Sequence, residues 1–87
     1  MKTMSIEIGL LKQFVMALIV RHFGSIEVFN GEFEILAPRV MDIPRTDNPI
    51  ITLRLFKDEI DQVVADGDWE YHIAAMWKII NDLEMSL

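Results

Sequence analysis

The chain has no cysteine, only four glycines and three prolines, and few basic residues. Without cysteine, neither a disulfide framework nor a thiolate metal site can form. Small secreted domains commonly depend on disulfides, so this absence favours a cytoplasmic protein. The glycines, at positions 9, 24, 31 and 67, are too scattered to form a glycine-rich phosphate loop.

Basic charge is the next shortage. Eight Lys and Arg residues stand against fourteen Asp and Glu residues, which gives a net charge of −6, and residues 58–87 hold eight acidic residues against Lys78 alone. Such a segment repels phosphates, so we expect no direct nucleic-acid binding. The charges either serve solubility or form an acidic surface for a basic partner, at Asp58, Glu59, Asp61, Asp66, Asp68 and Glu70.

Long apolar runs are also missing. The longest, residues 14–20, is far too short to cross a membrane. It faintly resembles the core of a signal peptide, but Arg21 and His22 follow it directly and no Ala-x-Ala cleavage site is present. We therefore expect no membrane association and no cleaved leader.

An N-terminal helix is predicted over residues 5–23, with Ser5 as its N-cap and Gly24 at its stop. Its broad apolar face includes Leu10 and Phe14. The opposite strip is apolar as well in the second half of the helix, and an 87-residue domain can hardly bury both sides. We interpret this strip as an oligomer interface formed by Met16, Val20 and Phe23.

The strongest local signal is Asn30-Gly31, which separates two runs of alternating apolar and polar residues. An Asn-Gly pair in this setting is typical of a two-residue β-hairpin turn. We therefore expect a hairpin over residues 25–36. Its register places four side chains on the core face, namely Ile26, Val28, Phe33 and Ile35.

The other face of this hairpin would carry an exposed aromatic ring among carboxylates, a surface that suits a partner with arginine or lysine side chains. The alternative is that Arg54, on the following strand, neutralises the carboxylates, because like charges directly opposite each other are destabilising. The predicted partner-binding residues are Glu27, Phe29, Glu32 and Glu34.

Three prolines predict an irregular connection over residues 37–49, with a short edge strand over residues 40–43 as an open alternative. Alternating residues 50–56 predict a third strand. Asp58 would then cap a short helix over residues 57–66. The core face of the third strand would consist of Ile51, Leu53 and Leu55.

A last helix is predicted over residues 69–85, between Gly67 with Asp68 as its start and the end of the chain. The whole chain, 1–87, is thus predicted to be a single α+β domain. It would have an N-terminal helix, an antiparallel three-stranded sheet and one or two C-terminal helices on one sheet face. The stripe of the last helix is Trp69, Ile73, Met76, Ile80, Leu83 and Leu87.

No motif for catalysis is present. The turn around Gly67 is not a calcium loop, because Val64 and Ile73 fall where side-chain oxygens are needed. His22 and His72 lie at the edges of apolar helix faces, where a hydrogen-bonded structural histidine is expected. We therefore expect no catalytic residue, no metal and no cofactor.

These features favour a non-catalytic protein-binding or regulatory module, such as an inhibitor, an adaptor or a small chaperone, which binds a basic protein partner through its acidic surface. An accessory protein of a phage or mobile element would have a similar size and charge. The alternatives are a self-assembling, homo-oligomeric subunit and a small enzyme.

Overall fold

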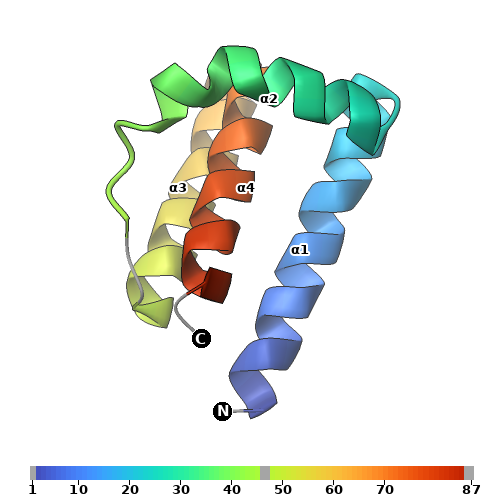
Figure 1. Cartoon of the computed structure of the whole chain (residues 1–87). Coiled ribbons are helices and arrows are strands. Elements are labelled where there is room, and N and C mark those ends of the chain that lie inside the picture. The colour runs from blue at the N-terminus through green and yellow to red at the C-terminus, as the bar shows by residue number, and fades with distance from the viewer. Residues whose placement is uncertain (1, 46–47, 86–87) are drawn as a thin grey trace.

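A computed structural model describes residues 2–45 and 48–85, with side chains from residue 8 onward. In these residues the chain forms four helices and no strand: α1 (Lys2–Phe23), α2 (Ile26–Val40), α3 (Pro49–Asp66) and α4 (Trp69–Met85). Helices α1 and α3 each run alongside α4, and α2 lies across α4 and also packs against α1 (Figure 1). The predicted α+β fold with its three-stranded sheet is therefore wrong.

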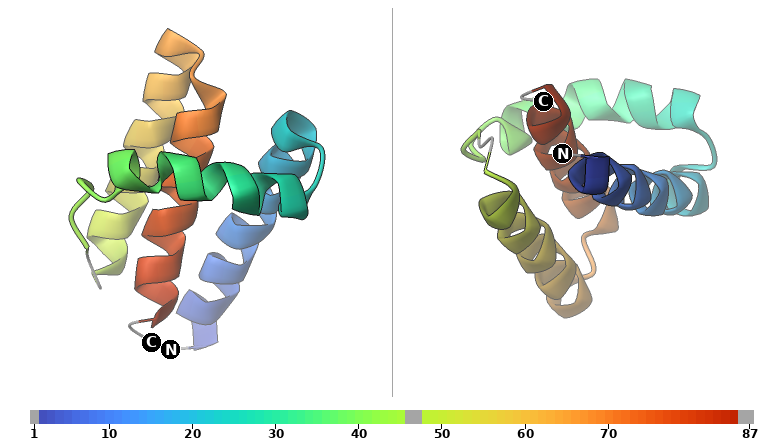
Figure 2. Two further views of the ribbon diagram at one scale, coloured as in Figure 1. Left: turned by 45° about the horizontal axis from the view of Figure 1, so that its top comes forward. Right: turned by 90° about the horizontal axis from the view of Figure 1, so that it is seen from below.

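Helix α4 is the centre of this arrangement, because α1, α2 and α3 all pack against it. Viewed along the bundle, α1 and α3 diverge from each other on two sides of α4 (Figure 2). Two small residues, Ala74 and Ala75, are fully buried and permit close approach of the neighbouring helices. The other buried side chains of α4 are His72, Ile73, Met76, Ile79, Ile80 and Leu83.

The predictions for the first and last helices of the chain, α1 and α4, are largely confirmed. Helix α4 has the predicted bounds, and its stripe forms the core as far as Leu83, whereas Leu87 lies outside the described residues. Helix α1 ends at Phe23, where Gly24 adopts a φ of 90° and its N–H donates to the carbonyl of Val20. The helix begins three residues earlier than predicted, so Ser5 lies inside it instead of capping it.

The predicted hairpin is wrong, because residues 26–40 form α2. Ser25 is the N-cap: it has extended backbone angles, and its hydroxyl accepts a hydrogen bond from the N–H of Val28 at 3.2 Å. Asn30 and Gly31 lie exposed in the middle of the helix. The short edge strand over residues 40–43 does not form either.

A second periodicity in the same segment explains the outcome. Five apolar residues recur at intervals of three and four, which places them on one side of a helix. Two apolar residues of the strand pattern, Val28 and Ile35, are instead 51% and 70% exposed. The side of α2 that packs inward consists of Ile26, Phe29, Phe33, Leu36 and Val40.

The predicted third strand and the short helix after it are a single helix, α3. Asn48 caps it, because its side-chain oxygen accepts from the N–H of Ile50 at 3.0 Å, and Pro49 occupies the first turn. Asp58 therefore lies within a helix rather than at its start. Gly67 ends the helix as predicted, with a φ of 73°. The inward side of α3 consists of Thr52, Phe56 and Val63.

Replacing Gly31 by alanine tests the helix directly. Gly31 is helical, and a Cβ there would meet nothing within 4 Å. We expect Gly31→Ala to raise the free energy of unfolding by about 1 kcal/mol, the usual difference between glycine and alanine in a helix. Urea denaturation measures this change. In a hairpin turn with positive φ the same substitution would lower stability.

Gly67→Ala is the matched control. A Cβ at this position also has free space, but the left-handed backbone disfavours any residue with a side chain. We expect a loss of about 1 kcal/mol. Opposite signs for the two glycines support the helical assignment of α2, and a destabilising Gly31→Ala would contradict it.

Candidate partner-binding site

A pocket of about 250 Å³ lies between the C-terminal halves of α2 and α4. Helix α2 supplies its apolar wall, and α4 supplies three polar side chains from its last two turns. Because α2 crosses α4, residues about forty positions apart in the sequence meet here. The pocket is lined by Phe33, Ala37, Val40, Met41, Lys78, Asn81 and Asp82.

The polar side of this pocket is mostly paired. The ammonium of Lys78 donates to the carboxylate of Asp82 at 2.7 Å and to the carbonyl of Ile43 at 3.0 Å. These bonds hold the segment after α2 against α4. The amide of Asn81, by contrast, has no hydrogen-bond partner among the described residues. The pocket thus offers an apolar wall and one amide for a ligand.

The volume indicates what the pocket can hold. Pockets for small-molecule ligands usually measure about 300–1,000 Å³, so 250 Å³ is small for a metabolite or cofactor. It is sufficient for one large apolar side chain. Pockets that accept a single anchoring side chain are typical of protein–protein contacts.

One edge of α2 connects this pocket to two of the predicted partner-binding residues. Five residues at intervals of three and four share that edge, and Ala37 and Met41 are its pocket end. Met41 is 72% exposed. Glu27 and Glu34 are exposed and form no ion pair within the part of the chain that the structure describes. The edge consists of Glu27, Asn30, Glu34, Ala37 and Met41.

The other two predicted partner-binding residues have different positions. Phe29 is fully buried and packs edge-on against Phe23 and Trp77, so it cannot be the exposed aromatic ring of a docking surface. Glu32 is half-buried. Arg54 is exposed on α3, which does not pack against α2, so it does not neutralise these glutamates.

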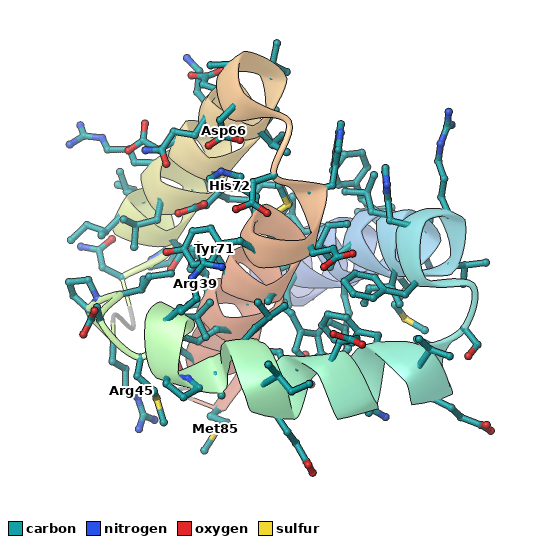
Figure 3. All side chains as sticks on the ribbon, turned by 90° about the horizontal axis from the view of Figure 1, so that it is seen from above. Arg39, Arg45, Asp66, Tyr71, His72 and Met85 are labelled. Atoms are coloured by element: carbon teal, nitrogen blue, oxygen red, sulfur yellow. The ribbon has the colours of Figure 1, made fainter. Side chains whose placement is uncertain are left out.

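A second polar cluster joins α3 to α4. His72 is only 2% exposed, and both of its ring nitrogens face carboxylates: Nδ1 lies 2.5 Å from Glu59 and Nε2 lies 2.8 Å from Asp66. We call these three residues the His72 network. In Figure 3, His72 and Asp66 lie beside the turn between α3 and α4. Two carboxylate acceptors require both nitrogens to donate, which only the imidazolium ion does.

Ionisation follows from this geometry. Burial alone would lower the pKa of His72, but the hydrogen bonds to Asp66 and Glu59 outweigh it and raise the pKa. The pKa of Asp66 is lowered, first by the N–H of Asp68 and then by His72. The two carboxylates thus favour the charged form of His72 at the junction of α3 and α4.

The predicted acidic surface is divided by this network. Glu59 and Asp66 belong to it, and Asp68 lies 3.7 Å from Arg39 of α2. Arg39 also lies over the ring of Tyr71, beside His72 (Figure 3). The pKa of Tyr71 is raised, mainly because the ring is partly buried and secondly because of the negative charge of Glu59. The exposed remainder of the acidic surface is Asp58, Asp61 and Glu70.

The predicted role of a hydrogen-bonded structural histidine agrees with the contacts of His72, whereas the contact shown for His22 is a ring stack. His72 has hydrogen-bond partners, and His22 stacks on Trp69 with ring centroids 4.6 Å apart. A catalytic base must reach its substrate, and the enclosed His72 is not among the residues that line the pocket. No group of three or more His, Cys, Asp or Glu side chains among the described residues is arranged so that it could hold a metal ion.

Two of the three predicted oligomer residues, Met16 and Val20, lie exposed on α1. Met16 and Val20 are 38% and 53% exposed, whereas Phe23 packs against the buried Phe29. Leu10 and Phe14, predicted to face the core, are also exposed. None of the described helices, including the apolar α1, is both long enough and apolar enough to cross a membrane.

Comparisons with family models, with curated protein sequences and with solved structures give no match for this chain.

The His72 network predicts a pH dependence. Because the folded-state pKa of His72 lies above 6.5, its stabilising effect is complete below pH 6.5 and is lost as the pH rises through the folded-state pKa. The free energy of unfolding should therefore fall with rising pH in that range. Urea denaturation between about pH 6 and pH 9 measures it.

His72→Gln is the control, because glutamine keeps a polar side chain but does not titrate. We expect the variant to be less stable at pH 6 and its stability to change little over the same range. A wild-type chain whose stability stays constant or increases from pH 6 to pH 9 would show that His72 is not held as the imidazolium.

Proposed function

We propose that the protein is a non-catalytic protein-binding module that takes one apolar side chain of a basic partner segment into the pocket between α2 and α4. The observation that supports this most directly is the pocket itself, with an apolar wall, the amide of Asn81 and the volume of a single side chain. A central, pocket-bound anchor commonly dominates the affinity of a protein–protein contact.

The charges beside the pocket support a basic partner. Glu34 precedes Ala37 by three residues on the same edge of α2, or about 4.5 Å along the helix axis. Glu27 lies further along the same edge, about 15 Å from Ala37 along the helix axis. Both carboxylates are exposed and form no ion pair within the described residues. A partner segment with its apolar anchor at Ala37 would thus place lysine or arginine side chains beside them.

Net charge adds a long-range contribution. At −6, the protein attracts positively charged partners, and the exposed Asp58, Asp61 and Glu70 strengthen that field. The cytoplasm is the compartment we propose, since secreted domains of this size commonly rely on disulfides, which this chain cannot form.

Selection from a displayed random peptide library tests the proposal without a known partner. We expect the recovered peptides to share one large apolar residue followed or preceded by lysine or arginine. Ala37→Trp fills the pocket with the protein's own side chain, so their affinity for this variant should fall about ten-fold or more. Failure to recover any peptide, or peptides that bind Ala37→Trp equally well, would contradict the proposal.

Charge reversal separates the contribution of the α2 edge from that of net charge. Glu34→Lys should lower the affinity of the recovered peptides by about five-fold or more. An exposed ion pair contributes up to about 1 kcal/mol, and the reversal adds repulsion. Asp61→Lys changes the net charge equally but lies on α3, so it should have the smaller effect. Fluorescence anisotropy of labelled peptides at low and high salt measures both.

A further inference from the structure

The outward side of α1 is the least charged helix surface in the described structure. Between Ile8 and Arg21 every exposed position is uncharged; Lys12 is half-buried, lies over the ring of Trp77 of α4 and pairs with Glu84 at 3.1 Å. We define this surface as the outer α1 face. It consists of Leu10, Gln13, Phe14, Met16, Ala17 and Val20.

Four of its side chains are large and apolar. Leu10 is 62% exposed, Val20 is 53% exposed and Phe14 is 46% exposed. The ring of Phe14 packs against the ring of Phe56 on α3, with ring centroids 6.1 Å apart. Leu10, Gln13, Ala17 and Val20 recur at intervals of three and four and form the central stripe of the face, and Phe14 and Met16 flank it on either side. This is the pattern by which one helix packs against another.

We propose that a second copy of this chain covers the outer α1 face, in an antiparallel α1–α1 pairing. The net charge of the chain and the lack of exposed charge on this face favour a second copy as the occupant. Two chains of −6 repel each other, and they repel least where neither carries exposed charge. The outward sides of the other helices do carry exposed charge, at Glu27 and Glu34 on α2 and at Lys57, Asp58 and Asp61 on α3. A basic partner, by contrast, would find no carboxylate on the outer α1 face.

The direction of the pairing follows from three residues. In an antiparallel two-fold pairing, Phe14 of each copy lies opposite Ala17 of the other, so a large side chain meets a small one twice. The two Arg21 side chains lie at opposite ends. A parallel pairing would place Phe14 against its own copy and bring the two Arg21 guanidinium groups together.

The size of the face sets the strength of the contact. Residues 10–20 cover about 17 Å of helix, which supplies less than the roughly 800 Å² per partner of a stable interface. The dimer is therefore reversible, and it dissociates on dilution to micromolar concentration. It uses a different side of the molecule from the α2–α4 pocket and does not depend on the proposed function.

Sedimentation velocity from about 1 to about 300 µM tests the pairing. We expect the mass to rise from 10.1 kDa to twice that value with concentration. Ala17→Glu should abolish the rise, and Ile35→Glu, which adds the same charge at an exposed position of α2, should not. A wild-type chain that stays at 10.1 kDa throughout, or equal effects of the two variants, would overturn the proposal.

Single cysteines in this cysteine-free chain test the direction. In the antiparallel pairing the two copies of residue 17 lie near the two-fold axis, whereas the two copies of residue 10 are offset by about 16 Å along the helix. A disulfide needs Cα atoms within about 7 Å. Oxidised Ala17→Cys should therefore form a covalent dimer and Leu10→Cys should not. Equal cross-linking of both would overturn the antiparallel arrangement.

Discussion

The enclosure of α4 by the other three helices determines where every other part of the molecule lies. Apolar side chains occur around most of its circumference, so one covering layer would leave half of them in water. Helices α1, α2 and α3 each cover a different side, and the buried Ala74 and Ala75 permit their close approach. The polar contacts of α4 then fix two neighbours: His72 holds α3, and Lys78 holds the segment after α2.

This arrangement also explains the high apolar content. Three helices around one leave each outer helix with a side that the core does not need. On α2 that side carries glutamates beside an apolar pocket, and on α1 it is uncharged and apolar. The two surfaces have different chemistry, and so they suit different occupants: a basic partner segment for the pocket and a second copy for the outer α1 face.

The sequence predicted the two helices whose patterns were unambiguous. In α4 the stripe from Trp69 to Leu83 fits only a helix, and Gly24 and Gly67 end α1 and α3 as expected. Residues 26–40 contain two patterns at once. Val28 and Ile35 complete an alternation, whereas Phe29 and Leu36 complete a helical stripe, and the Asn-Gly pair favoured the first. Packing against Trp77 of α4 selects the second.

The pocket could not be predicted in the same way. It requires α2 to cross α4, and nothing in the local sequence gives that crossing. Glu34 and Glu27 were identified as partner-binding candidates from their charge, but their relation to Ala37 depends on the helix. The partners of His72 lie six and thirteen residues away in the sequence, on another helix, which only the α3–α4 packing brings together.

Nuclear Overhauser contacts of the Phe29 ring test the central claim, that residues 26–40 form a helix packed on α4. The structure predicts contacts from Phe29 to the rings of Phe33 and Trp77, whose centroids lie 5.6 and 5.8 Å away. A hairpin turning at Asn30 would instead give cross-strand contacts between Val28 and Phe33, and it would leave Phe29 in solvent. Observing that second set would contradict the helix and, with it, the pocket.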